Sequence, residues 1–154
     1  MTDFVIEAED PRRTDVTALL ERHLAFCNEH TPPENVYALD IDGLLGPEIT
    51  LFALRRDGEL LGVGALKELD ASHGEIKSMH TAVEARGLGV GTAIVEHLVA
   101  TATARGYRRV SLETGSMNAF GPARSLYAKA GFVPCGAFGD YPDSATSSFM
   151  TLTL

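Results

Sequence analysis

The sequence has few of the residues that would link it to a disulfide framework, a metal site or a nucleic acid. It contains 154 residues, of which two are cysteines and none is tryptophan. Cys27 and Cys135 are far apart and have no CxxC spacing, which argues against disulfides and zinc and predicts small buried apolar side chains. Only 13 Lys and Arg residues stand against 21 Asp and Glu residues, so no nucleic acid is expected as a partner.

The sequence also lacks long apolar segments. No stretch approaches the roughly 20 apolar residues of a membrane-spanning helix, and no basic leader with an apolar run opens the chain, so we expect no membrane association and a cytoplasmic location. A hydrophobic content of 45% and a charged content of 22% are typical of a globular protein. The length predicts a single domain over residues 1–154. If the protein forms an oligomer, a homodimer is the most common form to expect.

Hydrophobic periodicity predicts a chain in which strands and helices are mixed. Strands are expected where short apolar runs lie between turn residues: 4–7, 49–55, 60–69, 73–81, 110–113, 132–135 and 149–154. Helices are expected where apolar residues recur every three or four positions: 11–29, 90–105 and 123–130, with room for a further short helix within 36–45. The Asp57-Gly58 pair predicts an antiparallel hairpin between two of the strands.

A glycine-rich segment, Arg86-Gly87-Leu88-Gly89-Val90-Gly91, stands at the start of the helix predicted over 90–105. Backbone amides at a helix N-terminus bind phosphate, and glycines let the main chain approach an anion closely. The segment lacks the Gly-Lys-Ser/Thr ending of a P-loop, and its glycines do not match G-x-G-x-x-G. We therefore predict a phosphate-binding turn; a turn tightened only for packing is the alternative.

Two motifs in this order resemble the signatures of the GCN5-related N-acetyltransferase family. They are R-x-x-G-x-G at Arg86, Gly89 and Gly91, and A-x-x-L-Y-x-x-x-G-F from Ala123 to Phe132. The order of elements matches the family over essentially the whole chain. The resemblance implies an α/β domain of the α+β type, with a mixed, mostly antiparallel sheet of about six to seven strands and about four flanking helices.

The resemblance further implies an enzyme that uses acetyl-CoA as co-substrate, without a metal. It would transfer the acetyl group to a primary amine, on a small molecule or a peptide, by direct attack in a ternary complex. A non-catalytic acyl-CoA-binding sensor or interaction module on the same fold is the main alternative. A nicotinamide-dependent enzyme is a weaker one that rests on the glycines alone.

Residues that would bind CoA can be assigned from the family motifs. The glycine-rich turn would hold the pyrophosphate, the backbone of the 73–81 strand would bind the pantetheine arm, and Tyr127 would protonate the departing thiolate. The expected residues are Met79, His80, Thr81, Arg86, Gly87, Leu88, Gly89, Val90, Gly91, Thr92, Asn118 and Tyr127. The family usually has Asn seven residues before the tyrosine, where this chain has Phe120, so Asn118 or a main-chain group is expected to replace it.

An amine must lose a proton before it attacks a thioester, so a base or a water relay is expected near the acyl group. The candidates are Glu75, His80 and Glu113, which lie on the two strands that flank the acyl group in the family. Glu75 is preferred by position. Glu113 is an alternative anchor for a cationic substrate.

Strand alternation bears on this choice. It predicts that Glu75, Lys77, Met79 and Thr81 share one side of their strand, which would turn His80 away from the cleft. A second histidine, His23, lies on the apolar stripe of the first helix and is expected to be structural.

Overall fold

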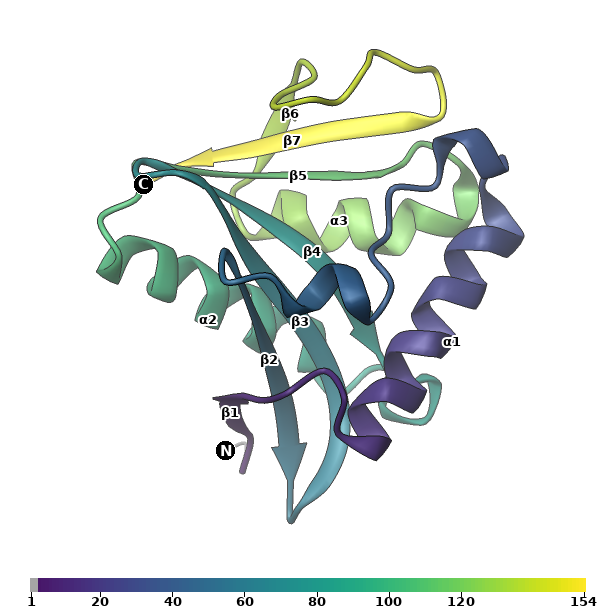
Figure 1. Ribbon diagram of the computed structural model, residues 1–154, viewed down its shortest axis with the longest axis vertical. Helices are drawn as coiled ribbons and strands as arrows, with labels where there is room; N and C mark the ends of the chain where they lie inside the picture. Colours follow the sequence, from purple (N-terminus) through teal and green to yellow (C-terminus); the bar gives the residue numbers. More distant parts are fainter. Residues whose placement is uncertain (1–2) are drawn as a thin grey trace.

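A seven-stranded sheet, in the order β1-β2-β3-β4-β5-β7-β6, forms the centre of the protein (Figure 1). The computed structural model describes residues 3–154. The strands are β1 (Val5–Ala8), β2 (Ile49–Arg56), β3 (Glu59–Asp70), β4 (His73–Thr81), β5 (Arg109–Gly115), β6 (Val133–Cys135) and β7 (Ser147–Thr153). Every neighbouring pair is antiparallel except β4 and β5, which are parallel. The predicted fold class, a mixed and mostly antiparallel sheet with flanking helices, is confirmed.

Helices cover both faces of the sheet, with α1 on one face and α2 and α3 on the other (Figure 1). The α-helices are α1 (Thr14–His30), α2 (Val90–Ala104) and α3 (Gly121–Lys129). The short 3-10 helices are η1 (Pro33–Asn35), η2 (Asp42–Leu45), η3 (Val83–Ala85) and η4 (Asn118–Phe120). The short helix expected within 36–45 is the 3-10 turn η2, because the glycine and proline residues around it interrupt any longer helix.

The buried core explains why these segments take these forms. Val16, Leu19 and Leu20 of α1 are buried against the sheet, and Ile94 and Leu98 of α2 are fully buried. With helices on both faces, the central strands β2 and β3 are buried on both sides, so their sequences read as continuous apolar runs rather than as an alternation.

The parallel strands β4 and β5 pair only at their beginnings. Their register runs from His73 opposite Arg109 to Ile76 opposite Leu112. Beyond that point both strands continue without pairing to each other, and Figure 1 shows them diverging. The backbone of β4 after Ile76 therefore faces an open wedge on its β5 side, and this wedge positions the site described below.

A bulge interrupts β4 inside the wedge. Opposite β3, Lys77 pairs with Ala65 but His80 pairs with Val63, so β4 contains one extra residue in this interval. Ser78 takes a positive φ of 55° there, a conformation that non-glycine residues seldom adopt. Such a bulge changes the side from which the following side chains project.

The bulge makes the expected alternation of β4 wrong. Glu75 and Lys77 project on the face that α1 covers, and after the bulge His80 does so as well, where it contacts His23 of α1. Met79 points instead to the α2 face, where it packs over Gly64. His80 is therefore turned toward the wedge and not away from it.

Candidate active site

A cavity of about 520 Å³ lies in the wedge between β4 and β5. Its walls come from α1 and the segment after it, from the turn before α2, and from α3. It is lined by most of the residues predicted to bind CoA or to act in catalysis: Met79, His80, Thr81, Arg86, Gly87, Gly89, Val90, Gly91, Thr92, Glu113 and Tyr127. The lining does not include Leu88 and Asn118, whose side chains are exposed, or Glu75.

The turn before α2 presents unpaired backbone amides to this cavity. Gly87 and Gly89 have φ values of +81° and +83°, which glycine adopts without the steric cost that an L side chain brings. Within the described chain, no amide from Gly87 to Thr92 donates to another residue. Together with the positive end of the α2 dipole and the exposed Arg86, these amides form an arrangement suited to a diphosphate.

Gly91 serves a different purpose from the two glycines before it. A Cβ atom at Gly91 would lie 2.9 Å from Cδ2 of Leu126, so the missing side chain lets α2 approach α3 closely. Around Gly87 and Gly89 a Cβ would meet no atom within 4 Å, so backbone conformation, and not space, calls for glycine there. One glycine of the motif thus sets helix packing while the other two shape the turn.

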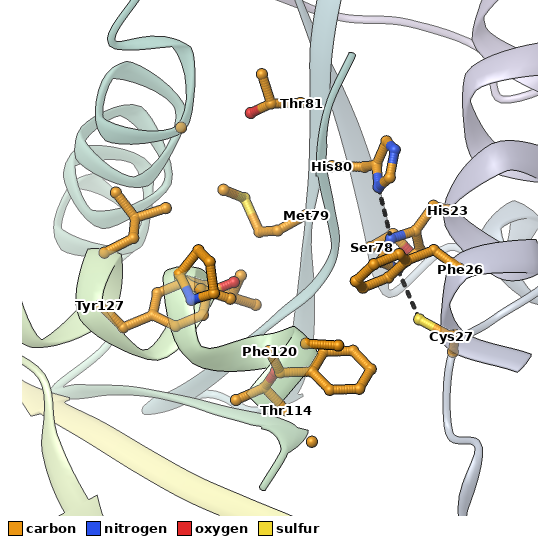
Figure 2. A pocket seen from close by; sticks show the side chains of 18 of the residues that line it. His23, Phe26, Cys27, Ser78, Met79, His80, Thr81, Thr114, Phe120 and Tyr127 are labelled. Carbon is orange, nitrogen blue, oxygen red and sulfur yellow. Dashed lines mark hydrogen bonds between the residues drawn. The ribbon is translucent and has the colours of Figure 1, made fainter. Parts of the chain in front are cut away.

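Tyr127 of α3 lies on the side of the cavity opposite α1 (Figure 2). Its side chain is buried, and its ring packs edge-on against Phe132 at a centroid distance of 5.9 Å. Burial raises the pKa of the Tyr127 phenol, so the hydroxyl keeps its proton at neutral pH. A protonated phenol at this position can serve as a proton donor.

Glu75, the base preferred from the sequence, is enclosed by its neighbours. Its side chain is 3% exposed and accepts a hydrogen bond of 2.5 Å from the Tyr141 hydroxyl. Lys77 Nζ lies 3.3 Å from the same carboxylate oxygen and donates to the Tyr141 hydroxyl at 2.7 Å. This buried cluster supports the cavity wall through Lys77, which lines it, but Glu75 itself does not line the cavity.

Glu113 of β5 lines the cavity and is half-buried. Burial raises the pKa of its carboxyl and so does the Glu75 carboxylate, while the nearby Ser147 hydroxyl and the Lys77 ammonium lower it. Within residues 3–154, Glu113 has no ion-pair partner. A cavity-facing carboxylate with a raised pKa can attract a cation or accept a proton.

His80 is linked to α1 by a chain of polar contacts that Figure 2 shows as dashed lines. His80 Nδ1 lies 3.2 Å from His23 Nδ1, and His23 Nε2 lies 3.7 Å from Cys27 Sγ. Burial lowers the pKa of both imidazoles to about 4, so both are neutral at neutral pH. His23, which the sequence predicted to be structural, thus lines the cavity beside His80.

The cysteines are less buried than the sequence predicted. Both Cys27 and Cys135 are free thiols of intermediate exposure. Cys27 lines the cavity, and burial raises the pKa of its thiol to about 11, which keeps it neutral.

Several residues of the cavity were missed by sequence reasoning. Phe26 of α1 packs edge-on against Phe120 at 5.3 Å, so the residue that replaces the family Asn forms part of an aromatic wall. Tyr37, which follows η1, also lines the cavity and packs against Tyr141 at 5.1 Å. No motif marks these positions, because they come together only through the packing of α1 and two irregular segments on the sheet.

The wedge, the amide-lined turn and the buried tyrosine fit the acetyltransferase family that the two motifs resemble, and comparisons with known proteins show that family. The Acetyltransferase (GNAT) family model matches residues 16–132. The chain is 45% identical to the uncharacterized N-acetyltransferase YsnE of Bacillus subtilis, over 97% of this chain and 99% of that protein. It is 39% identical to the uncharacterized N-acetyltransferase YedL of Escherichia coli, over 98% and 95% of the two chains.

A solved structure shows the same fold. A GNAT family acetyltransferase from Elizabethkingia anophelis, which has acetyl-CoA bound, aligns with a TM-score of 0.74 at 20% identity over 100% of both chains. The chain therefore belongs to the GNAT family of N-acetyltransferases, as its two motifs predicted.

The described residues 3–154 lack two further features. No three His, Cys, Asp or Glu side chains there are grouped so as to hold a metal ion. No helix in that part of the chain has the length and apolar character needed to cross a membrane.

Proposed function

We propose that this protein transfers an acetyl group from acetyl-CoA to a primary amine. The observation that carries the proposal is the turn from Gly87 to Thr92, whose amides have no partner among residues 3–154 and open into a cavity that reaches the wedge between β4 and β5. The turn would bind the CoA pyrophosphate, and the free edge of β4 beyond Ile76 would pair with the amide groups of the pantetheine arm.

The residues of the cavity support direct transfer. The amine nitrogen would attack the thioester carbon, a C–N bond would form, and the C–S bond would break. Tyr127 would give its proton to the departing thiolate, since its raised pKa keeps it protonated until then. The proton lost by the amine would pass to Glu113, because Glu75 is held by Lys77 and Tyr141 outside the cavity lining.

Two measurements test the proposal. Isothermal titration should show binding of acetyl-CoA and none of NAD, because the glycines of the turn do not follow the dinucleotide pattern. Acetyl-CoA incubated with a panel of primary amines should release free thiol only when both amine and enzyme are present. Acetyl-CoA binding without thiol release for any amine would favour the non-catalytic sensor, and absence of acetyl-CoA binding would refute the assignment of the turn.

A further inference from the structure

The charges around Glu113 in the cavity do not cancel. We name six lining residues the acceptor end, because the acceptor amine would meet Glu113 among them: His23, Cys27, Tyr37, Lys77, His80 and Glu113. These residues come from α1, the segment that follows it, β4 and β5. Together with the groups directly behind the lining, they determine which charge a substrate must carry.

The only cation of the acceptor end is already neutralised. Lys77 is 8% exposed and lies 3.3 Å from the Glu75 carboxylate, while its ammonium also donates to the Tyr141 hydroxyl. A buried ion pair of this kind is costly to break, because separating it leaves an uncompensated charge in a poorly solvated place. Lys77 is therefore not free to bind a second carboxylate.

The remaining titratable groups around Glu113 are neutral at neutral pH. Burial lowers the pKa of the two histidines to about 4, and burial raises the pKa of the Cys27 thiol to about 11. Burial likewise raises the pKa of the Tyr141 phenol behind the wall. The exposed Arg86 belongs to the turn before α2, where the diphosphate would sit, and Arg22 is paired with Glu84 at 3.1 Å. Within the described chain, the single cation Lys77 thus stands beside two carboxylates, Glu75 and Glu113, so the acceptor end keeps one net negative charge.

We propose that the acceptor is a monocationic primary amine without a carboxylate beside its amino group, and that Glu113 binds its ammonium. This inference rests on the proposed acetyl transfer and adds the substrate class. The ammonium supplies the missing counter-charge for Glu113. A carboxylate on the carbon that bears the amino group would lose its hydration on binding. It could not pair with Lys77, which is already paired with Glu75, and the negative charge of Glu113 would repel it.

Three ligands with the same side chain distinguish the effect of a carboxylate charge on binding from the effect of ligand size: 3-methylbutylamine, leucine and leucine methyl ester. The ester is larger than leucine but lacks the negative charge. Binding of each to the enzyme–CoA complex is measured by calorimetry, and kcat/KM is measured from thiol release. We expect the amine and the ester to bind and react, and leucine to be weaker by about tenfold or more in both measurements.

The Glu113→Gln variant should weaken binding of the amine and the ester by about tenfold while leaving acetyl-CoA affinity unchanged. Glu96→Gln removes the same charge from an exposed position on α2 and is the matched control, which should leave both affinities unchanged.

The outcomes separate this proposal from the proposed function. Leucine that binds or reacts as well as the ester would overturn the substrate class, and so would amine binding that is absent or indifferent to Glu113→Gln. Amines that bind in a Glu113-dependent way but release no thiol would instead refute acetyl transfer and leave the proposed binding site intact.

Discussion

The substitution Gly89→Ala tests the glycine-rich turn most directly. Gly89 has a φ of +83°, and a Cβ there would contact no atom within 4 Å, so the cost to folding comes from backbone conformation alone. That cost is about 1–2 kcal/mol, which corresponds to a fall in Tm of about 2–8 °C for a chain of this length. A displaced turn amide would lose a hydrogen bond to a charged phosphate worth about 1.5–3 kcal/mol, so the Kd for acetyl-CoA should rise about 10- to 100-fold.

Gly58 provides a matched control for this prediction. It lies in the hairpin turn between β2 and β3, has a φ of +81°, and also has no atom within 4 Å of an added Cβ. Gly58→Ala should lower Tm by a similar amount, measured by thermal unfolding without ligand, while calorimetry shows an unchanged Kd for acetyl-CoA. Equal acetyl-CoA affinity in Gly89→Ala and Gly58→Ala would refute the role of the turn.

Three further predictions follow from the buried groups. Tyr127→Phe should lower kcat by about 100-fold, the usual contribution of a general acid, with little change in the Kd for acetyl-CoA; an unchanged kcat would remove Tyr127 from the mechanism. The buried His23 and His80 have pKa values lowered to about 4, so between about pH 6.5 and pH 4 the unfolded chain binds more protons than the folded one, and stability should be lost as the pH falls through this range. His23→Gln should make Tm, measured by thermal unfolding, depend less steeply on pH. An equally steep dependence of Tm on pH would contradict a lowered His23 pKa. Gly64→Val should destabilise the fold by about 1–3 kcal/mol in urea unfolding, since even a Cβ would lie 2.6 Å from Met79 Sδ, and an unchanged midpoint would show that the α2 face can adjust.

The parts of the site that could be predicted from the sequence are those with local signals. The turn before α2 and the helix itself were predictable because the glycines, Arg86 and the apolar spacing after Val90 lie within a few residues of one another. The hairpin at Asp57-Gly58 was predictable for the same reason, since two turn residues between apolar runs determine it.

The parts that could not be predicted depend on contacts between distant segments. A bulge at Ser78 leaves no mark in the sequence of β4, because its positive φ falls on a serine rather than a glycine. The contact of His23 with His80 joins residues 57 positions apart and depends on that bulge. Strand alternation alone therefore gave the wrong side for His80.

The different environments of Glu75 and Glu113 follow from their neighbours two residues along each strand. Side chains at i and i+2 share one face of a strand, and the residue two after Glu75 is Lys77, which neutralises it. The residue two after Glu113 is Gly115, which has no side chain. The residue paired with Glu113 on β7 is the apolar Phe149. Lys77 on the adjacent strand β4 is already paired with Glu75, so Glu113, which faces the cavity, is left to attract a cation there. This local charge pattern was present in the sequence, and it favours Glu113 over Glu75 as the group that meets the amine.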